Sequence, residues 1–415
     1  MSAPATRLFL PPSVELKAGL IRLGELLPGA FPLRTKHRDA LPARIRELSE
    51  WLTSDRDSLP RDYMARPEHL SAYLHWFLPW NIYRQGRLLA GLQLDLAPGT
   101  RILDLGAGPL TFLQALWLTR PELRTRELSY LGLDRADPAL KVGRKLFAGL
   151  TGGNCAAWSV RTDRAIAGAG RTPEADILVA ANLLNEIERP GKTARSRSRG
   201  DGAAEGSGDS SADIMLERWE RQVSANGAIL LIEPGIRDAA RQLSRLRQAA
   251  LERGWKVQAP CPHTEDCPMP GRRNGPWCHF TFAPTGAPDW LVDLSRKARL
   301  PKERASLSFL LLTRGEDGPV RIAQPTPVAG ERGLVRVVSE TFALPGGNVG
   351  QYGCSARGQI LLQMRDAPRG NTAGGASEPG DLLSVRWSEA TGKDAKSGSL
   401  IVPVKRRKPD SRRRG

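Results

Sequence analysis

The sequence has no apolar run of the roughly 18–20 residues that a membrane-spanning helix needs, so no membrane span is predicted. Its first residues, MSAPATRLFLPPSVELK, lack a cationic stretch followed by a long apolar one, and a secretion signal is not expected. Five cysteines in a chain of 415 residues without such a signal indicate metal ligands or free thiols, not a disulfide framework. These absences favour a cytoplasmic protein.

Acidic residues are in the minority, because 61 Lys and Arg stand against 44 Asp and Glu, which gives a formal net charge of +17. Arginine is commoner than lysine, and its planar guanidinium group makes bidentate contacts to phosphate. The first partner that this charge indicates is nucleic acid, and the second is an anionic membrane surface. Part of the charge lies in the tail KRRKPDSRRRG, for which the alternative is a flexible arm without a binding role.

The length predicts two or three domains. Apolar residues at helical spacing predict a helical region over residues 1–95, with a break at Pro79. Aromatic residues cluster around this break, and we expect them to pack the helices onto the next domain; an RNA-stacking surface is the alternative. They are Tyr73, Trp76, Phe77, Trp80 and Tyr83.

Short apolar strands alternate with helices over residues 96–315, which predicts an α/β domain with a parallel sheet and helices on both faces. Within it, residues 189–213 are of low complexity and are expected to be a disordered surface insertion. The alternative is an arginine-rich arm that orders on RNA. Residues 316–365 predict a small β subdomain, and residues 366–415 a partly disordered basic tail in which LLSVRW and LIVPV could form strands.

The first predicted strand of the α/β domain ends in the loop LDLGAGPL, which contains Asp104, Gly106 and Gly108. Its glycines allow a tight turn and a close approach to a ligand, and a helix N-terminus follows. The dinucleotide fingerprint requires a glycine where Thr111 stands. The D-x-G-x-G form instead resembles motif I of class I S-adenosylmethionine (AdoMet) methyltransferases, which commonly carry a glycine at the place of Leu110.

Two acidic residues follow later strands of the same domain. Asp134 closes the second strand, where a carboxylate can accept hydrogen bonds from both ribose hydroxyls of an adenosyl ligand. Asp163 is expected after the third strand, where class I methyltransferases usually contact the adenine. Ordinary loop or helix-capping roles are the alternative for both.

Asn182, Asn185 and Glu186 stand in AANLLNEI, at the exit of the fourth strand. In the methyltransferase fold this loop faces the methyl donor, so Asn182 is a further candidate for cofactor contact. Asn182 and Glu186 are also the candidates for catalysis. The sequence contains neither the Asn-Pro-Pro-Tyr motif of amino-group methyltransferases nor the Pro-Cys motif of cytosine C5 enzymes. Cys155 is expected to be a small buried residue and not a nucleophile.

Four of the five cysteines suggest one metal centre. Cys261, Cys267 and Cys278 lie in a Pro- and Gly-rich loop at residues 259–280, and Cys354 follows far downstream. Such a loop has little capacity to form a helix or strand of its own. Thiolates that converge on a metal would order it, because the binding energy of the metal becomes folding energy.

The spacing of these cysteines leaves the kind of centre open. Thiolate-rich sets suit zinc or iron–sulfur clusters, but the close cysteine pairs of zinc ribbons are absent here. In a zinc site, His263 or His279 could replace one cysteine. Unligated cysteines in a loop are the remaining alternative.

Several motifs together resemble the methyltransferase-like small-ribosomal-subunit family, which includes a mitochondrial small-subunit assembly factor and bacterial relatives. They are ILDLGAGPLTFLQALW, ANLLNEI, ILLIEPG and, most specifically, APCPHTEDCPMP followed by WCHF. The resemblance covers residues from about 60 to 360. It implies a class I AdoMet methyltransferase fold joined to a 4Fe–4S cluster, with Cys261, Cys267, Cys278 and Cys354 as ligands.

The resemblance also implies a role in maturation of the small ribosomal subunit, through contact with its rRNA. We therefore expect an AdoMet-binding, iron–sulfur-containing RNA-binding factor of ribosome biogenesis and translation, monomeric and possessing no membrane contact. It would be either an rRNA methyltransferase or a non-catalytic assembly protein with a vestigial AdoMet pocket. The cluster would fix the angle between its loop and the β subdomain, and it would present Arg272 and Arg273 to phosphates.

Overall fold

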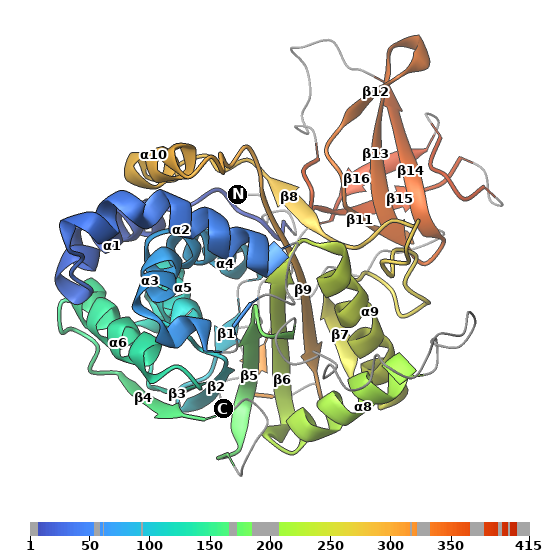
Figure 1. Cartoon of the computed structure of the whole chain (residues 1–415). Coiled ribbons are helices and arrows are strands. Elements are labelled where there is room, and N and C mark those ends of the chain that lie inside the picture. The colour runs from blue at the N-terminus through green and yellow to red at the C-terminus, as the bar shows by residue number, and fades with distance from the viewer. Residues whose placement is uncertain are drawn as a thin grey trace, which may run out of the picture.

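The molecule is a central sheet with helices on both faces and a separate β subdomain beside it (Figure 1). The computed structural model describes residues 7–53, 59–60, 62–92, 94–165, 172–184, 207–315, 318–321, 333–365, 377–388, 392–396 and 399–404. In this described part of the chain, no helix combines the length and the apolar character needed to cross a membrane.

The N-terminal region is helical, as predicted, but its helices do not break at Pro79. The helices are α1 (Val14–Ala30), α2 (Thr35–Thr53), α3 (Pro67–Ala72) and α4 (Leu78–Leu92). A π-helical turn over Tyr73–Phe77 connects α3 directly to α4. Proline lacks an N–H, and its ring presses on the carbonyl one turn earlier; a wider turn at this point accommodates both effects. The predicted break is therefore wrong.

The central sheet follows the order β4-β3-β2-β5-β6-β9-β7, with β8 paired to β9. Its strands are β2 (Thr100–Leu105), β3 (Leu128–Asp134), β4 (Trp158–Arg164), β5 (Ala175–Ala181), β6 (Val223–Pro234), β7 (Lys256–Ala259), β8 (Phe280–Phe282) and β9 (Ala305–Thr313). Neighbouring strands from β4 to β6 are parallel, whereas β9 is antiparallel to both β6 and β7. The sheet is thus mixed and not purely parallel as predicted.

The antiparallel strand follows from the route of the chain. We call the edge where β2, β3, β5 and β6 end the carboxyl edge. After β7 the chain stays at this edge through the cysteine loop between β7 and β8, then through β8 and α10 (Asp289–Lys297). The chain therefore enters β9 from that edge and runs back between β6 and β7. Ligands of open α/β sheets bind at this edge.

Two apolar layers cover the two faces of the sheet. On one face α5 (Thr111–Thr119), α6 (Asp137–Thr151) and the N-terminal helices pack with Ile102, Tyr130 and Val179. On the other face α8 (Ser207–Glu220) and α9 (Arg237–Glu252) pack with Leu103 and Leu178. Figure 1 shows these helix groups on opposite sides of the sheet. The predicted three-layer α/β arrangement is present.

Helix α8 begins within the segment expected to lack structure. Most of residues 189–213 lie outside the described residues, but α8 starts at Ser207, and Ala212 in it is buried in the core. The prediction of disorder is therefore wrong for the end of the segment, because Ala212 packs in the core together with Met215 and Leu216 just beyond it. Also unforeseen are β8, α10 and a short pairing of β1 (Asp95–Leu96) with β10 (Val320–Arg321).

The β subdomain is larger than the sequence pattern indicated. Its strands are β11 (Gly333–Val337), β12 (Phe342–Leu344), β13 (Asn348–Ser355), β14 (Gly358–Arg365), β15 (Leu382–Arg386) and β16 (Leu400–Pro403). Strand β15 pairs with β11, so LLSVRW belongs to the sheet, and LIVPV supplies β16. The boundary expected at residue 365 cuts this sheet, and the tail from Lys405 lies outside the described residues.

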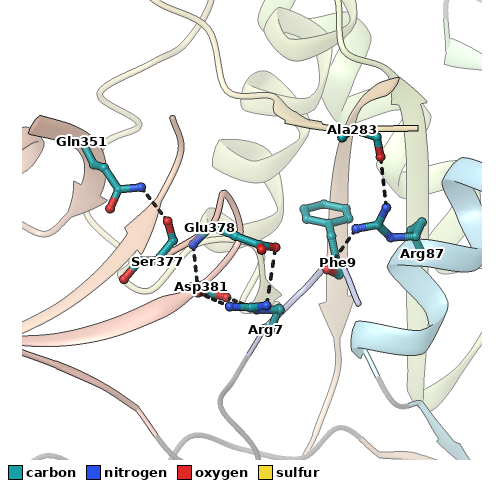
Figure 2. A network of polar contacts seen from close by, with 8 residues as sticks. All are labelled: Arg7, Phe9, Arg87, Ala283, Gln351, Ser377, Glu378 and Asp381. Atoms are coloured by element: carbon teal, nitrogen blue, oxygen red, sulfur yellow. Dashed lines mark hydrogen bonds and ion pairs between the residues drawn. The ribbon is translucent and has the colours of Figure 1, made fainter. Parts of the chain in front are cut away.

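The first described residues connect the β subdomain to the rest of the molecule (Figure 2). Arg7 Nε donates to Asp381 Oδ1 over 2.8 Å, and its guanidinium also pairs with Glu378. Two residues later, the Phe9 carbonyl accepts from Arg87 of α4, and the Phe9 ring stacks on Phe282 of β8. We call residues 7–9 the N-terminal strap, and it joins the β subdomain to the helical layer independently of the cysteines.

Candidate functional site

The glycine loop has the backbone conformation that its sequence predicts. Gly106 and Gly108 have φ of 70° and 51°, and the N–H groups of Gly106 and Ala107 donate to the Leu133 carbonyl. Leu110 also adopts the left-handed conformation, with φ 60° and ψ 44°, directly before α5. A non-glycine residue pays strain there, on the order of 1–3 kcal/mol. The loop therefore keeps the shape that a third glycine would give it.

Asp104 lies fully buried beneath this loop, at the end of β2. Tyr130 from the neighbouring strand donates its hydroxyl to Asp104 Oδ2 over 2.5 Å. The other oxygen, Oδ1, is buried with no hydrogen-bond partner among the described residues. Burial, with a contribution from the charge of Asp134, raises the pKa of Asp104 to about 7. The site thus holds a buried carboxylate that has one donor, Tyr130, and one oxygen without a partner among the described residues.

Asp134 links the second strand to the glycine loop. Its Oδ2 accepts from the Gly108 N–H over 2.8 Å, and its Oδ1 accepts from the Ala136 N–H over 2.7 Å. Burial raises its pKa, although these two backbone bonds oppose the shift. Each oxygen retains a lone pair, so the carboxylate can still accept from a ligand hydroxyl.

Other predicted contacts lie around this edge. Asp163 is exposed and belongs to β4 itself, not to a loop after it; it pairs in register with Leu133. Asn182 follows β5 with a φ of 59°, and its N–H donates to the Ile232 carbonyl. Asn185 and Glu186 lie outside the described residues. The structure thus brings Asp104, Asp134 and the glycines together, with Asp163 and Asn182 on neighbouring strands.

Glu233, near the end of β6, is a residue that the sequence reasoning missed. It is 1% exposed, and its Oε1 accepts from the N–H groups of Leu183 and Leu184, each over 2.9 Å. It therefore fixes the loop after β5 against β6. The signal was available as a glutamate inside the apolar strand ILLIEPG, where only a partnered carboxylate is tolerated.

The four cysteines named above lie near enough to one another for their charges to interact, and we call them the cysteine centre. Three come from the loop between β7 and β8, and Cys354 comes from β13 of the β subdomain. The charge of each of the other three raises the pKa of Cys278, after the larger effect of burial. Nε2 of His263 lies 3.2 Å from Sγ of Cys354. All are free thiols, as is Cys155.

These thiols do not have the environment of nucleophiles. Burial raises the pKa of Cys261, Cys278 and Cys354, and their mutual repulsion adds to it. Catalytic cysteines need the opposite shift. Four thiolates can coexist here only if a bound cation or metal cluster stabilises them.

Two buried arginines face the cysteine centre. Arg247 of α9 is 2% exposed and donates to the carbonyls of His263 and Glu265, but its Nε and Nη1 are buried without a hydrogen-bond partner in the described part of the chain. Its charge acts on Cys261, Cys278 and Cys354. Arg336 of β11 is also buried and donates to the Pro260 carbonyl over 3.0 Å. The arginines therefore favour the thiolate form of the cysteines, and with it a centre whose total charge, thiolates included, is negative.

The described residues contain no group of three His, Cys, Asp or Glu side chains arranged to hold a single metal ion. The predicted metal loop is therefore not supported by the described residues. What the structure does supply is four neighbouring thiols with two buried cations beside them.

The turn of the cysteine loop is held by α9. Arg237 stacks on the ring of Trp277 at 4.4 Å and donates to the Arg272 carbonyl over 2.6 Å. The side chains of Arg272 and Arg273 are exposed. The loop therefore presents two cations from a fixed backbone.

The predicted aromatic seam is present. Trp76, Phe77, Trp80 and Tyr83 are buried, and the indoles of Trp76 and Trp80 both donate to Ser295 of α10. Tyr73 is half-exposed. Most of these rings hold the helices onto the α/β domain and are not available for RNA stacking.

One family model matches part of this chain. Residues 206–346 match the model of the family described as mitochondrial small ribosomal subunit Rsm22. The match covers about a third of the chain and includes α8, α9, the cysteine loop, α10 and β9. The Rsm22 match thus contains the first three cysteines and Arg247. None of the curated proteins matches the sequence.

Solved structures give only weak similarity. A methyltransferase from Pyrococcus furiosus has a TM-score of 0.29 and 13% identity, covering 53% of this chain and 78% of its own. A SAM-dependent methyltransferase from Thiobacillus denitrificans has 0.29 and 13%, covering 57% and 92%. Phosphoethanolamine N-methyltransferase 2 from Haemonchus contortus has 0.34 and 12%, covering 62% and 60%.

Proposed function

We propose that this protein binds AdoMet at the glycine loop and contacts rRNA during biogenesis of the small ribosomal subunit. The observation that carries the cofactor is Asp104, whose buried Oδ1 has no partner among the described residues. AdoMet bears two positive charges, on its sulfonium and its amino group, and a buried carboxylate is suited to such a ligand. The match to the Rsm22 family supports the connection with the small ribosomal subunit.

The loop offers room for the ligand at Gly108. A Cβ atom added there would meet only the Met64 Cε, at 3.7 Å, so the backbone can be approached closely. Asp134 would hold the ribose hydroxyls with its remaining lone pairs. Asn182 lies at the exit of β5, on the side where the methyl acceptor would be placed.

As an enzyme, the protein would be an rRNA methyltransferase. AdoMet would supply the electrophilic methyl group. The residues of this chain would position a base of the RNA beside it, and such positioning is a large part of catalysis in bimolecular transfers. No general base emerges among Asn182 and its described neighbours, and the candidate Glu186 stays a prediction.

A second candidate function is a non-catalytic assembly factor with a vestigial pocket. Leu183 favours it, because its side chain covers Gly106 so closely that an added Cβ would lie 2.7 Å from its Cδ1. The same loop carries the strained Leu110 in place of a glycine. The Leu183 side chain thus fills space beside Gly106 that an open cofactor loop leaves free.

We further propose a 4Fe–4S cluster at the cysteine centre, with zinc as the alternative. Cys261, Cys267, Cys278 and Cys354 would hold it. The cubane with four thiolates carries a net negative charge, which suits the buried guanidinium of Arg247. Thiolates are the usual ligands of such a cluster, and the four cysteines would supply them.

Methyl transfer is tested with radiolabelled AdoMet and small subunits from a strain that lacks the protein. The protein is purified without oxygen, and Asp104→Asn is the matched control. Label in rRNA that the control does not produce would establish a methyltransferase. Subunits that bind the protein but take up no label would support the non-catalytic assembly factor. If neither the protein nor the variant binds the subunits, the proposed function fails.

The metal is tested on the same anaerobic protein by elemental analysis and visible absorption. Iron and sulfide in equal amounts, with broad absorption near 400 nm, are the expected result for a cluster. One zinc ion per chain without this absorption would replace the cluster with the zinc alternative. A protein without either metal would contradict both assignments.

A further inference from the structure

Two cationic side chains lie near each other at the carboxyl edge, and none of the described carboxylates forms an ion pair with either. Arg84 belongs to α4, and Lys302 belongs to the loop between α10 and β9. Burial lowers the pKa of Arg84 to about 10. Burial lowers the pKa of Lys302 to about 8, and the charge of Arg84 contributes to this shift. No carboxylate contributes to either pKa, and among the described residues neither cation forms an ion pair.

Neutral groups hold both cations in place. Arg84 Nη1 donates to the Ser306 carbonyl over 3.2 Å, and its Nη2 donates to the Asn81 side chain. Lys302 Nζ lies 4.6 Å from the centre of the Trp76 ring. The two side chains are therefore positioned without being neutralised, at a cost that a bound anion would offset.

The pair belongs to the same edge as the glycine loop. Ser306 stands at the start of β9, and a Cβ added to Gly235, just after β6, would lie 2.8 Å from the Ser306 Cβ. Glu233, two residues before Gly235, holds the loop after β5. The end of β6 thus contacts the loop after β5 on one side and, on the other, Ser306, whose carbonyl accepts from Arg84.

We propose that Arg84 and Lys302 form a phosphate-binding site that holds a phosphodiester of the RNA at the carboxyl edge. This proposal rests on the proposed function, because that function makes RNA the source of the phosphate. Arg84 supplies a planar fork with N–H groups to spare, and Lys302 supplies a point charge. Tyr73 lies close to this pair. Asn81 connects them, because its Oδ1 accepts from Arg84 and its Nδ2 donates to the Tyr73 hydroxyl over 3.3 Å, and the Tyr73 ring is half-exposed. A base could stack there.

The test is the salt dependence of binding to a single-stranded ribo-oligonucleotide, measured by fluorescence anisotropy. Lys302→Gln is the main variant, because Lys302 makes no hydrogen bond in the described structure and its loss should leave the fold intact. We expect a five- to tenfold loss of affinity, and a smaller slope of log affinity against log salt by about 0.7, the value for one single-strand phosphate contact. Lys302→Arg should retain the slope. Lys297→Gln, an exposed lysine on α10, is the matched control and should change little.

A second measurement examines phosphate binding without RNA. Lys302 is acetylated with acetic anhydride in the presence and absence of pyrophosphate, and mass spectrometry compares its rate with that of Lys297. We expect pyrophosphate to slow modification of Lys302 alone. If the protein binds no RNA while pyrophosphate protects Lys302, the RNA function fails and the phosphate site stands. If RNA binds with an unchanged slope in Lys302→Gln and pyrophosphate protects neither lysine, the site is overturned and the RNA function stands.

Discussion

At the glycine loop the buried charges are carboxylates, whereas around the cysteine centre they are guanidinium groups. Burial raises the pKa of both Asp104 and Asp134, and the charge of Asp134 adds to the shift of Asp104. Hydrogen bonds from Tyr130 and from backbone N–H groups offset only part of these shifts. Arg247 donates to backbone carbonyls and its charge acts on the thiols, and Arg336 donates to the Pro260 carbonyl. The desolvation cost of a buried charge is offset when a partner of opposite sign lies beside it. The first site is thus suited to a cation and the second to an anion.

The largest effect is expected from removing one ligand of the anionic occupant. Cys354→Ser should abolish the cluster and the associated folding energy, which is on the order of 10 kcal/mol for structural metal sites. Metal content and thermal unfolding of the anaerobic protein measure it. Cys155→Ser, outside the centre, is the control. Retention of the full metal content in Cys354→Ser would remove Cys354 from the ligand set.

Removing the opposite charge sharpens the comparison. Arg247→Met keeps the volume and leaves the cluster charge without its buried partner, so we expect about 3–5 kcal/mol lower stability of the metal-loaded protein. Chemical unfolding with and without the metal separates this effect from the loss of backbone hydrogen bonds. Arg245→Met on the same helix is the control. Equal losses in both forms would show that Arg247 only supports the loop.

At the glycine loop the charge that matters is the negative charge of Asp104, and AdoMet affinity should depend on it. Because burial raises the pKa of Asp104 to about 7, the unliganded fold favours the protonated form, and the stability that this gives is lost as the pH rises through 7. AdoMet needs the ionised form, so its affinity should rise up to tenfold per unit as the pH increases toward 7. Calorimetric titration from pH 5.5 to 8.5 measures this.

Asp104→Asn should remove the pH dependence and weaken AdoMet binding by roughly 10- to 100-fold, the value of a hydrogen bond to a charged group. The variant retains an oxygen that can accept from Tyr130. Asp163→Asn, on the exposed end of β4, should weaken binding less. A pH profile that is the same in the wild type and in Asp104→Asn would assign the titration to another group.

The smallest effect concerns how the β subdomain is held. The cysteine centre was expected to fix its angle, but the N-terminal strap also spans the junction (Figure 2). Arg7→Ala should cost only about 1 kcal/mol, since the pair with Asp381 is partly solvent-exposed. Arg22→Ala, which breaks an exposed pair within α1, is the control. Destabilisation by Arg7→Ala as large as that by Cys354→Ser would make the strap the main connection.

Local patterns predicted the elements that carry their own signal. The glycine loop, the alternating strands and helices, and the aromatic seam followed from periodicity and turn chemistry. Local patterns failed where distant contacts decide. The π-turn before Pro79 depends on packing of the whole α3–α4 rod, and Ser207–Asp213 becomes helical because Ala212 reaches the core. Strand β9 is antiparallel because of where the preceding chain lies, which periodicity cannot report.

Residue types alone singled out the two candidate sites, a glycine loop of the AdoMet-binding type with Asp104 and a set of four cysteines. Only the tertiary structure decided the electrostatic partners. Glu233, Arg247 and the pair Arg84–Lys302 are ordinary charged residues in the sequence, scattered over four different elements. Their meaning comes from burial and from the neighbours that long-range folding brings to them, because the energy of a charge depends on its surroundings and not on its place in the chain.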